Sequence, residues 1–130
     1  MPSARKYSRK REAIYNAICS SHSHPAAGTI YAQLKPEFPD LSLGTVYRNL
    51  SLFVNEGTIR CVCVVDGNER FDGDTSDHPH FVCNCCGCVS DLADDRLLMD
   101  TAAVESRNGI TVSRTDLVFY GVCADCTNRT

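Results

Sequence analysis

Two pairs of cysteines, each with the spacing C-x-x-C, constrain this chain more than any other feature of its sequence. Cys83 and Cys86 form the first pair, and Cys123 and Cys126 form the second. Each spacing makes a tight turn that presents two thiolates to one point, and four thiolates satisfy tetrahedral zinc at about 2.3 Å. Because such a site leaves no position for water, the predicted zinc is structural, and its binding contributes on the order of 10 kcal/mol to folding.

The register of the first pair has an alternative, because the segment FVCNCCGCV also contains Cys85-x-x-Cys88. We favour Cys83 and Cys86, since Gly87 follows them and supplies the open backbone that such a turn needs. The competing interpretation of the four cysteines is a redox pair or free core thiols. Five cysteines are left without an assigned role: Cys19, Cys61, Cys63, Cys85 and Cys88. Cys61 and Cys63 share one strand face, where small buried side chains are favoured over a second thiolate site.

In a cytoplasmic chain, nine cysteines point away from a disulfide framework, because a reducing compartment keeps thiols free and clustered pairs are then metal ligands or redox motifs. No apolar run approaches the roughly 18 residues of a membrane span, and the N-terminal residues lack the apolar stretch of a signal peptide. We therefore expect a cytoplasmic protein without a membrane partner.

The charges divide the chain into two halves. Residues 1–60 carry a net charge of +4, whereas residues 61–130 carry −7. A basic half joined to an acidic half indicates one surface for a polyanion and one for cations, and the alternative is ordinary solvated charge.

The basic half has the pattern of three helices and a hairpin. Helices are predicted over residues 9–21, with Ser8 as the cap, over 26–35, and from the cap Ser42 to Gly57. The dipeptide Asp66-Gly67 between two apolar runs predicts a β-hairpin. Together these elements predict a winged helix-turn-helix, whose third helix would enter the major groove of DNA.

The exposed face of that third helix is predicted to contact DNA through Thr45, Tyr47, Arg48 and Asn49. Arginine and asparagine can hydrogen-bond base edges or phosphates, and a tyrosine ring can pack on a thymine methyl. The basic stretch 5–11 could lie along the DNA backbone. The competing interpretation is a small helical domain that binds protein and leaves Arg48 solvated.

All four histidines lie in two places along the chain. His22 and His24 form one pair and His78 and His80 the other, with Asp72, Asp74, Asp77 and Asp91 around the second pair. Imidazoles and carboxylates together suit iron, manganese or zinc, unlike a site made of thiolates. Singly, each histidine would be a surface or capping residue, but their clustering favours metal ligands.

The segments HPAAGTIY, TVYRNL, GNERFD, SDHPHFVCNCCG and YGVCADC together resemble the ferric uptake regulator family over about residues 7–126. The resemblance implies an α+β fold with a winged-helix domain at 1–72, a hinge at 73–79 and a dimerisation domain at 80–130 that holds the zinc bound by four cysteines. In that domain we expect a helix over 97–107, ended by Asn108-Gly109, and a strand over 110–120 of an antiparallel sheet. The implied partners are double-stranded operator DNA and a second copy of the chain.

Within the family, the peroxide-sensing branch is the more similar one. The resemblance implies a regulatory iron or manganese site made of His24, Asp72, His78, His80 and Asp91. The iron-uptake branch commonly has glutamates at these carboxylate positions and a further histidine, and no histidine follows His80 here. Metal closing this site would hold the repressor in its DNA-binding form, and peroxide acting at ferrous iron would oxidise His24 or His78 and release the DNA. Manganese would hold the same form and resist the reaction.

Two alternatives stay open. One is an iron- or zinc-responsive repressor of the same family that does not sense peroxide, and His22 could compete with His24 for the metal. The other is a thiol- or metal-dependent enzyme, which we disfavour because the chain lacks the H-x-E and P-C-x-x-C of zinc deaminases and because four thiolates leave no open position on zinc. No small molecule beyond the metal and hydrogen peroxide is expected as a ligand.

Overall fold

A computed structural model describes residues 2–92 and 100–128, with side chains from residue 9 onward. The chain forms two compact units, Met1–Thr75 and Ser76–Thr130. The division falls inside the segment 73–79 for which we predict a hinge, and the hinge motion itself stays a prediction.

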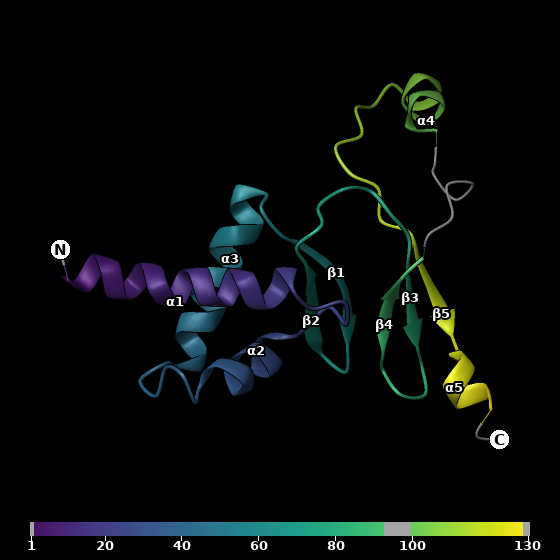
Figure 1. Ribbon diagram of the computed structural model, residues 1–130. Coiled ribbons are helices and arrows are strands. Elements are labelled where there is room, and N and C mark those ends of the chain that lie inside the picture. The colour runs from purple at the N-terminus through teal and green to yellow at the C-terminus, as the bar shows by residue number, and fades with distance from the viewer. Residues whose placement is uncertain (1, 93–99, 129–130) are drawn as a thin grey trace. The chain divides into compact units, whose positions relative to one another are not determined.

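The first unit begins with three helices, α1 (Pro2–Cys19), α2 (Ala27–Leu34) and α3 (Leu43–Glu56) (Figure 1). Their apolar faces meet in one core, whose most buried members are Ile14, Ile18, Ile30, Leu41, Val46 and Leu50. The prediction that Ser8 caps the first helix is wrong, because α1 already begins at Pro2. The lysine and arginine side chains of that first stretch are good helix formers, so the helix extends through them.

Helix α3 has the two ends that its sequence predicts. The Ser42 hydroxyl accepts a hydrogen bond from the Thr45 backbone amide at 3.1 Å, which satisfies one of the free amides of the first turn. Gly57 closes the other end in the left-handed conformation, with φ of 77°. Both caps are local signals, and both predictions are confirmed.

A two-stranded antiparallel hairpin, β1 (Arg60–Val65) and β2 (Asn68–Asp72), completes the first unit. Asp66 and Gly67 both have positive φ, 51° and 79°, as the predicted two-residue turn requires. A bulge between Cys61 and Cys63 shifts the register. Phe71 packs into the helical core, and the strand ends on Asp72 at the surface of that core.

The residue after β2 lies against the end of α1. A Cβ atom at Gly73 would meet the Cys19 Sγ at 2.7 Å and the Cys19 Cα at 3.1 Å, which is closer than real contacts allow. Only glycine therefore fits where the β1–β2 hairpin returns to α1, directly after Asp72.

We expect Gly73→Ala to destabilise the protein by about 1–3 kcal/mol, because the added methyl group must push strand and helix apart. Gly28→Ala is the matched control, since nothing lies within 4 Å of its Cβ position and alanine favours helix α2 by up to about 1 kcal/mol. Urea unfolding measures both changes, and equal stability of the two variants would contradict the tight approach.

The second unit contains a three-stranded sheet of β3 (His80–Cys83), β4 (Val89–Asp91) and β5 (Val118–Gly121), in the order β4-β3-β5. Strand β4 pairs antiparallel to β3, as expected, but β5 pairs parallel to it. The predicted strand over residues 110–120 is therefore mostly wrong. Strand β4 already brings the chain back to the end of the sheet where β3 begins, and β5 starts at that same end, since Asp91 and Val118 both lie opposite His80. Residues 110–117 therefore connect α4 to β5, and pairing begins only at Val118.

Two short helices also belong to this unit. Helix α4 (Thr101–Asn108) is capped by the Asp100 side chain and ends at Gly109, with φ of 63°, which confirms the predicted C-terminal end. The predicted start at residue 97 lies outside the described residues. A four-residue helix that the sequence did not predict, α5 (Ala124–Thr127), follows β5. Among the residues described, no helix is both long and apolar enough to cross a bilayer.

Candidate metal sites and nucleic-acid interface

The turn between β3 and β4 (residues 83–88, called here the knuckle) places a sulfur among backbone amides. Cys83 Sγ accepts hydrogen bonds from the amides of Cys85, Cys86 and Cys123, each at 3.4 Å. The Gly87 amide donates to the Cys83 carbonyl at 2.9 Å, and Gly87 adopts a φ of 75°. The glycine that we used to choose the register thus has the left-handed backbone conformation expected of it.

These amides favour the charged form of the buried sulfur. Hydrogen bonds from Cys86 and then Cys123 lower the pKa of Cys83 to about 6, although burial opposes this. Cys83 is only 1% exposed. A buried thiolate without a counter-charge is costly, so the donor chemistry of the knuckle fits a soft, thiophilic cation such as zinc.

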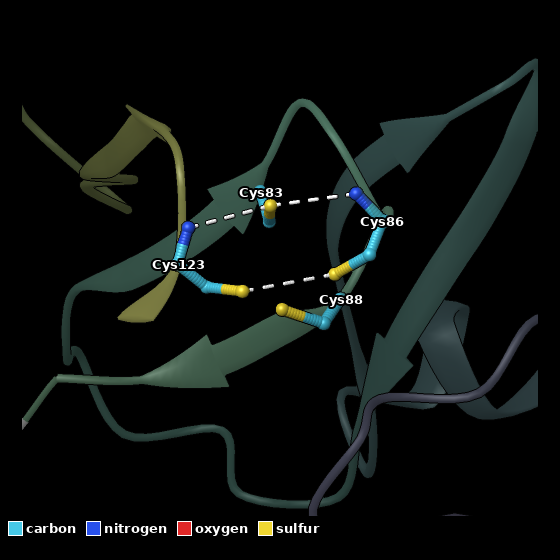
Figure 2. A group of neighbouring side chains, drawn as sticks. All are labelled: Cys83, Cys86, Cys88 and Cys123. Atoms are coloured by element: carbon cyan, nitrogen blue, oxygen red, sulfur yellow. Dashed lines mark hydrogen bonds between the residues drawn. The ribbon is translucent and has the colours of Figure 1, made fainter. Parts of the chain in front are cut away.

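Four sulfurs gather at this point. The Sγ atoms of Cys83, Cys86, Cys88 and Cys123 all lie within 4.8 Å of one another, and Figure 2 shows those of Cys86, Cys88 and Cys123 directed toward each other. Sγ of Cys86 and Sγ of Cys123 are 3.8 Å apart. The cluster joins the knuckle to Cys123, two residues after β5, and it contains Cys88 in the place that the predicted pairs give to Cys126.

Cys126, the fourth predicted ligand, is also part of this neighbourhood. It is 3% exposed, and hydrogen bonds with Cys123 and then Cys85 raise its pKa. Cys88 is the member that sequence reasoning left without a role. The overlapping spacing Cys85-x-x-Cys88 was the signal that could have identified it.

Three predicted regulatory ligands converge in the second unit. The β3–β4 register places His80 directly opposite Asp91. Oδ1 of Asp91 lies 3.1 Å from Nε2 of His80 and 3.0 Å from Nε2 of His78. The two imidazole rings are 4.4 Å apart between centroids. One carboxylate oxygen between two imidazoles is a donor set that suits iron, manganese or zinc.

Two further predicted ligands lie together in the first unit. His24 Nδ1 is 3.7 Å from Asp72 Oδ2, and both side chains are buried. His24 has a φ of 54°, which is uncommon for a non-glycine residue. The β2 residue Arg70 holds this backbone in place by donating hydrogen bonds to the carbonyls of Ser23, at 2.7 Å, and His24. His22, the possible competitor, is exposed.

The third helix presents part of the predicted DNA-binding face. Tyr47 is 50% exposed, Arg48 is exposed and Thr45 is half-buried. The expectation that Asn49 lies on this face is wrong, because its side chain is 1% exposed. Its Nδ2 donates to the Thr45 carbonyl at 2.9 Å and its Oδ1 accepts from Arg11 Nε at 3.2 Å, so Asn49 ties α3 to α1.

The basic stretch in α1 also has contacts within the first unit. Lys10 pairs with Asp40 at 3.0 Å, and the Arg9 guanidinium lies over the Phe38 ring at 5.9 Å from its centroid. Together with the bond from Arg11 to Asn49, these contacts hold α1 against α3 and against the segment between α2 and α3. Fewer basic side chains of this stretch are therefore available to contact a DNA backbone.

The fold and the donor sets define the class: an α+β protein with a cysteine cluster near its C-terminus. The model of the ferric uptake regulator family matches residues 3–120, so the chain belongs to the ferric uptake regulator family. Members of this family are metal-dependent transcriptional repressors that bind DNA, and they are not enzymes. The family's metals are zinc and iron or manganese, and this chain carries donor sets suited to both kinds.

Individual relatives show the same likeness. The chain is 33% identical over 120 residues to the peroxide-responsive repressor PerR of Staphylococcus aureus strain USA300, covering 92% of this chain and 81% of that protein. The peroxide stress regulator of Campylobacter jejuni is 27% identical, with a TM-score of 0.81 over 96% of this chain and 94% of that one. The ferric uptake regulator of Vibrio cholerae is 26% identical, with a TM-score of 0.68 over 87% and 88%.

Proposed function

We propose that this chain is a metal-dependent repressor that senses peroxide through the side chains around its regulatory metal. The proposed ligands of that metal, iron or manganese, are His24, Asp72, His78, His80 and Asp91. The proposed structural zinc ligands are Cys83, Cys86, Cys123 and Cys126. The observation that carries the sensor assignment is the Asp91 carboxylate oxygen at 3.0 and 3.1 Å from the two imidazoles of the second unit.

The coupling of metal to DNA rests on how the ligands are divided. Three proposed ligands belong to the unit 76–130 and two to the unit 1–75. Neither set alone fills the coordination of a divalent ion, so an ion held by both would have a higher affinity for the arrangement that brings them together. That difference in affinity shifts the population toward one arrangement of the units, with residues 73–79 as the hinge.

The peroxide response depends on the histidines. Ferrous iron, when bound, can reduce hydrogen peroxide beside its ligands, whereas manganese resists that reaction. His78 is held by the Ser76 carbonyl at 2.8 Å on one ring nitrogen and by Asp91 on the other, so its ring is fixed beside the proposed metal. His24 and His78 are the side chains that we expect to gain oxygen.

The test compares the ferrous and manganese forms of the whole protein before and after peroxide. We expect the ferrous form to lose operator binding and to gain one oxygen on His24 or His78, as measured by fluorescence anisotropy and peptide mass spectrometry. The manganese form should keep both its mass and its affinity. A ferrous form that keeps DNA binding and an unmodified mass would instead identify an iron- or zinc-responsive repressor without peroxide sensing.

DNA recognition is proposed to use a winged helix-turn-helix of α1 to α3 and the β1–β2 hairpin, with α3 in the major groove. The exposed Tyr47 and Arg48 and the half-buried Thr45 support this proposal. Arg48 Nη2 donates to Thr45 Oγ1 at 3.1 Å, which holds the guanidinium over the first turns of the helix.

If the Arg48 side chain contacts a base, we expect Arg48→Ala to weaken operator binding by about 1–3 kcal/mol. If it contacts a phosphate instead, the slope of log affinity against log salt concentration should become smaller by about one. Arg107→Ala, which removes an exposed arginine from α4 in the second unit, is the charge-matched control. A salt titration of operator affinity measures both variants. Arg48→Ala behaving like Arg107→Ala would remove Arg48 from the DNA interface.

A homodimer is proposed to form through the second unit. Large apolar side chains are exposed there on and around α4 and β5: Val104, Ile110, Phe119, Tyr120 and Val122. Exposed side chains of this size are typical of surfaces that a partner covers, and two-fold symmetry suits a near-palindromic operator. A cytoplasmic location is proposed as well, because a reducing compartment keeps cysteines such as these out of disulfides.

A further inference from the structure

The cysteine cluster contains more sulfur than one zinc ion can bind. A tetrahedral zinc site takes four thiolates. Six cysteines lie around the knuckle and the residues after β5, connected by the contacts already described: Cys83, Cys85, Cys86, Cys88, Cys123 and Cys126. The surplus raises the question of which sulfurs share the ion.

Three of these sulfurs belong to both possible tetrads. Cys83, Cys86 and Cys123 lie with Cys88 within 4.8 Å. Cys126, the second member of the Cys123-x-x-Cys126 pair, is 3% exposed and lies near the same sulfurs. Cys86 and Cys123, whose sulfurs are 3.8 Å apart, form one edge of the group. Cys88 lies within 4.8 Å of both sulfurs, and Cys126 follows Cys123 by three residues on α5.

The two remaining sulfurs come from different elements. The Cys88 carbonyl accepts from the Cys83 amide at 2.9 Å, so the β3–β4 turn fixes Cys88. Cys126 instead lies on α5, a four-residue helix near the end of the described chain. Cys88 is exposed and Cys126 is buried. Each sulfur is therefore brought to the cluster independently of the other.

We propose that Cys88 and Cys126 are alternative fourth ligands of one zinc ion that Cys83, Cys86 and Cys123 hold in common. This inference rests on the proposed zinc site. Exchange forms one zinc–sulfur bond as the other breaks, and the proton of the incoming thiol passes to the outgoing thiolate, so nothing is oxidised or reduced. The ion stays four-coordinate when α5 is displaced, because the knuckle supplies the replacement.

The test uses the full-length protein with cobalt(II) in place of zinc. Sulfur-to-cobalt charge-transfer absorption increases with the number of bound thiolates. Cobalt ions bound only by histidine and aspartate do not contribute to it. We expect Cys126→Ser and Cys88→Ser each to keep the full absorption of the parent, and the double variant to lose about a quarter of it or the metal altogether. Cys63→Ser, on strand β1, is the control outside the cluster.

Iodoacetamide labelling supplies a second reading that does not require the double variant to fold. In Cys126→Ser loaded with metal, Cys88 should be protected from alkylation. Loss of absorption in Cys126→Ser alone, or free labelling of Cys88 in it, would overturn the exchange and leave Cys126 as the fixed ligand. A parent protein without thiolate absorption, or an unchanged Cys83→Ser variant, would instead reject the zinc site itself.

Discussion

Cys83→Ser is expected to remove the zinc and with it the folded structure of residues 76–130. Cys83 is 1% exposed and is the sulfur on which three backbone amides converge. Zinc binding of this kind contributes on the order of 10 kcal/mol, which is comparable to the roughly 5–15 kcal/mol that stabilises a whole domain. Among the described residues, the sheet of the second unit consists of three short strands, so the zinc should supply much of the stability of this unit.

Zinc content per chain and thermal unfolding of the full-length variant measure this effect. Cys63→Ser is again the matched control, because Cys63 is partly buried on β1 in the other unit. Chelation of the parent protein should reproduce the Cys83→Ser unfolding curve. A metal-free variant with the parent's melting temperature would show that the fold does not depend on zinc.

Asp91→Asn is expected to abolish the response of operator binding to manganese or iron. The substitution keeps the size of the side chain and the β3–β4 pairing, but it removes the negative charge that both His78 and His80 face. Loss of outer-shell partners alone lowers metal affinity by about 10–100-fold, so loss of a direct ligand should cost on the order of 100-fold or more.

Asp116→Asn is the control for this variant, because Asp116 forms a surface ion pair with Arg114 at 2.8 Å in the same unit, and such pairs contribute about 1 kcal/mol or less. Metal titrations followed by operator anisotropy compare the two. If Asp91→Asn responded to manganese at the same concentration as the parent, Asp91 would not be a ligand and the sensor assignment would fail. An unchanged far-ultraviolet spectrum excludes misfolding as the cause.

The predictions that succeeded rested on local signals. Ser42 and Gly57 bracket α3 because a cap needs only neighbouring backbone groups, and Asp66-Gly67 sets the hairpin turn for the same reason. The proximity of His78 and His80 to one another follows from their spacing, but their convergence on Asp91 depends on strand register.

The predictions that failed depended on contacts distant in sequence. Asn49 has a residue type suited to base recognition, yet its burial is decided by Arg11 on another helix. The antiparallel sheet was an expectation from the family resemblance, but β5 pairs parallel with β3, and no local pattern in the sequence specifies strand direction. Cys88 was passed over because spacing alone does not say which of two overlapping pairs faces a third segment of the chain.

Strand β3 has consequences that reach beyond its four residues. It begins at His80, beside Asp91, and ends at Cys83, at the centre of the sulfur cluster. The turn that the cluster ties together also fixes the pairing of β3 with β4, and that pairing sets His80 across from Asp91. Oxidation of these cysteines that releases the structural zinc should therefore also abolish the response to the regulatory metal. Neither iron nor manganese would then restore operator binding until the cysteines are reduced again.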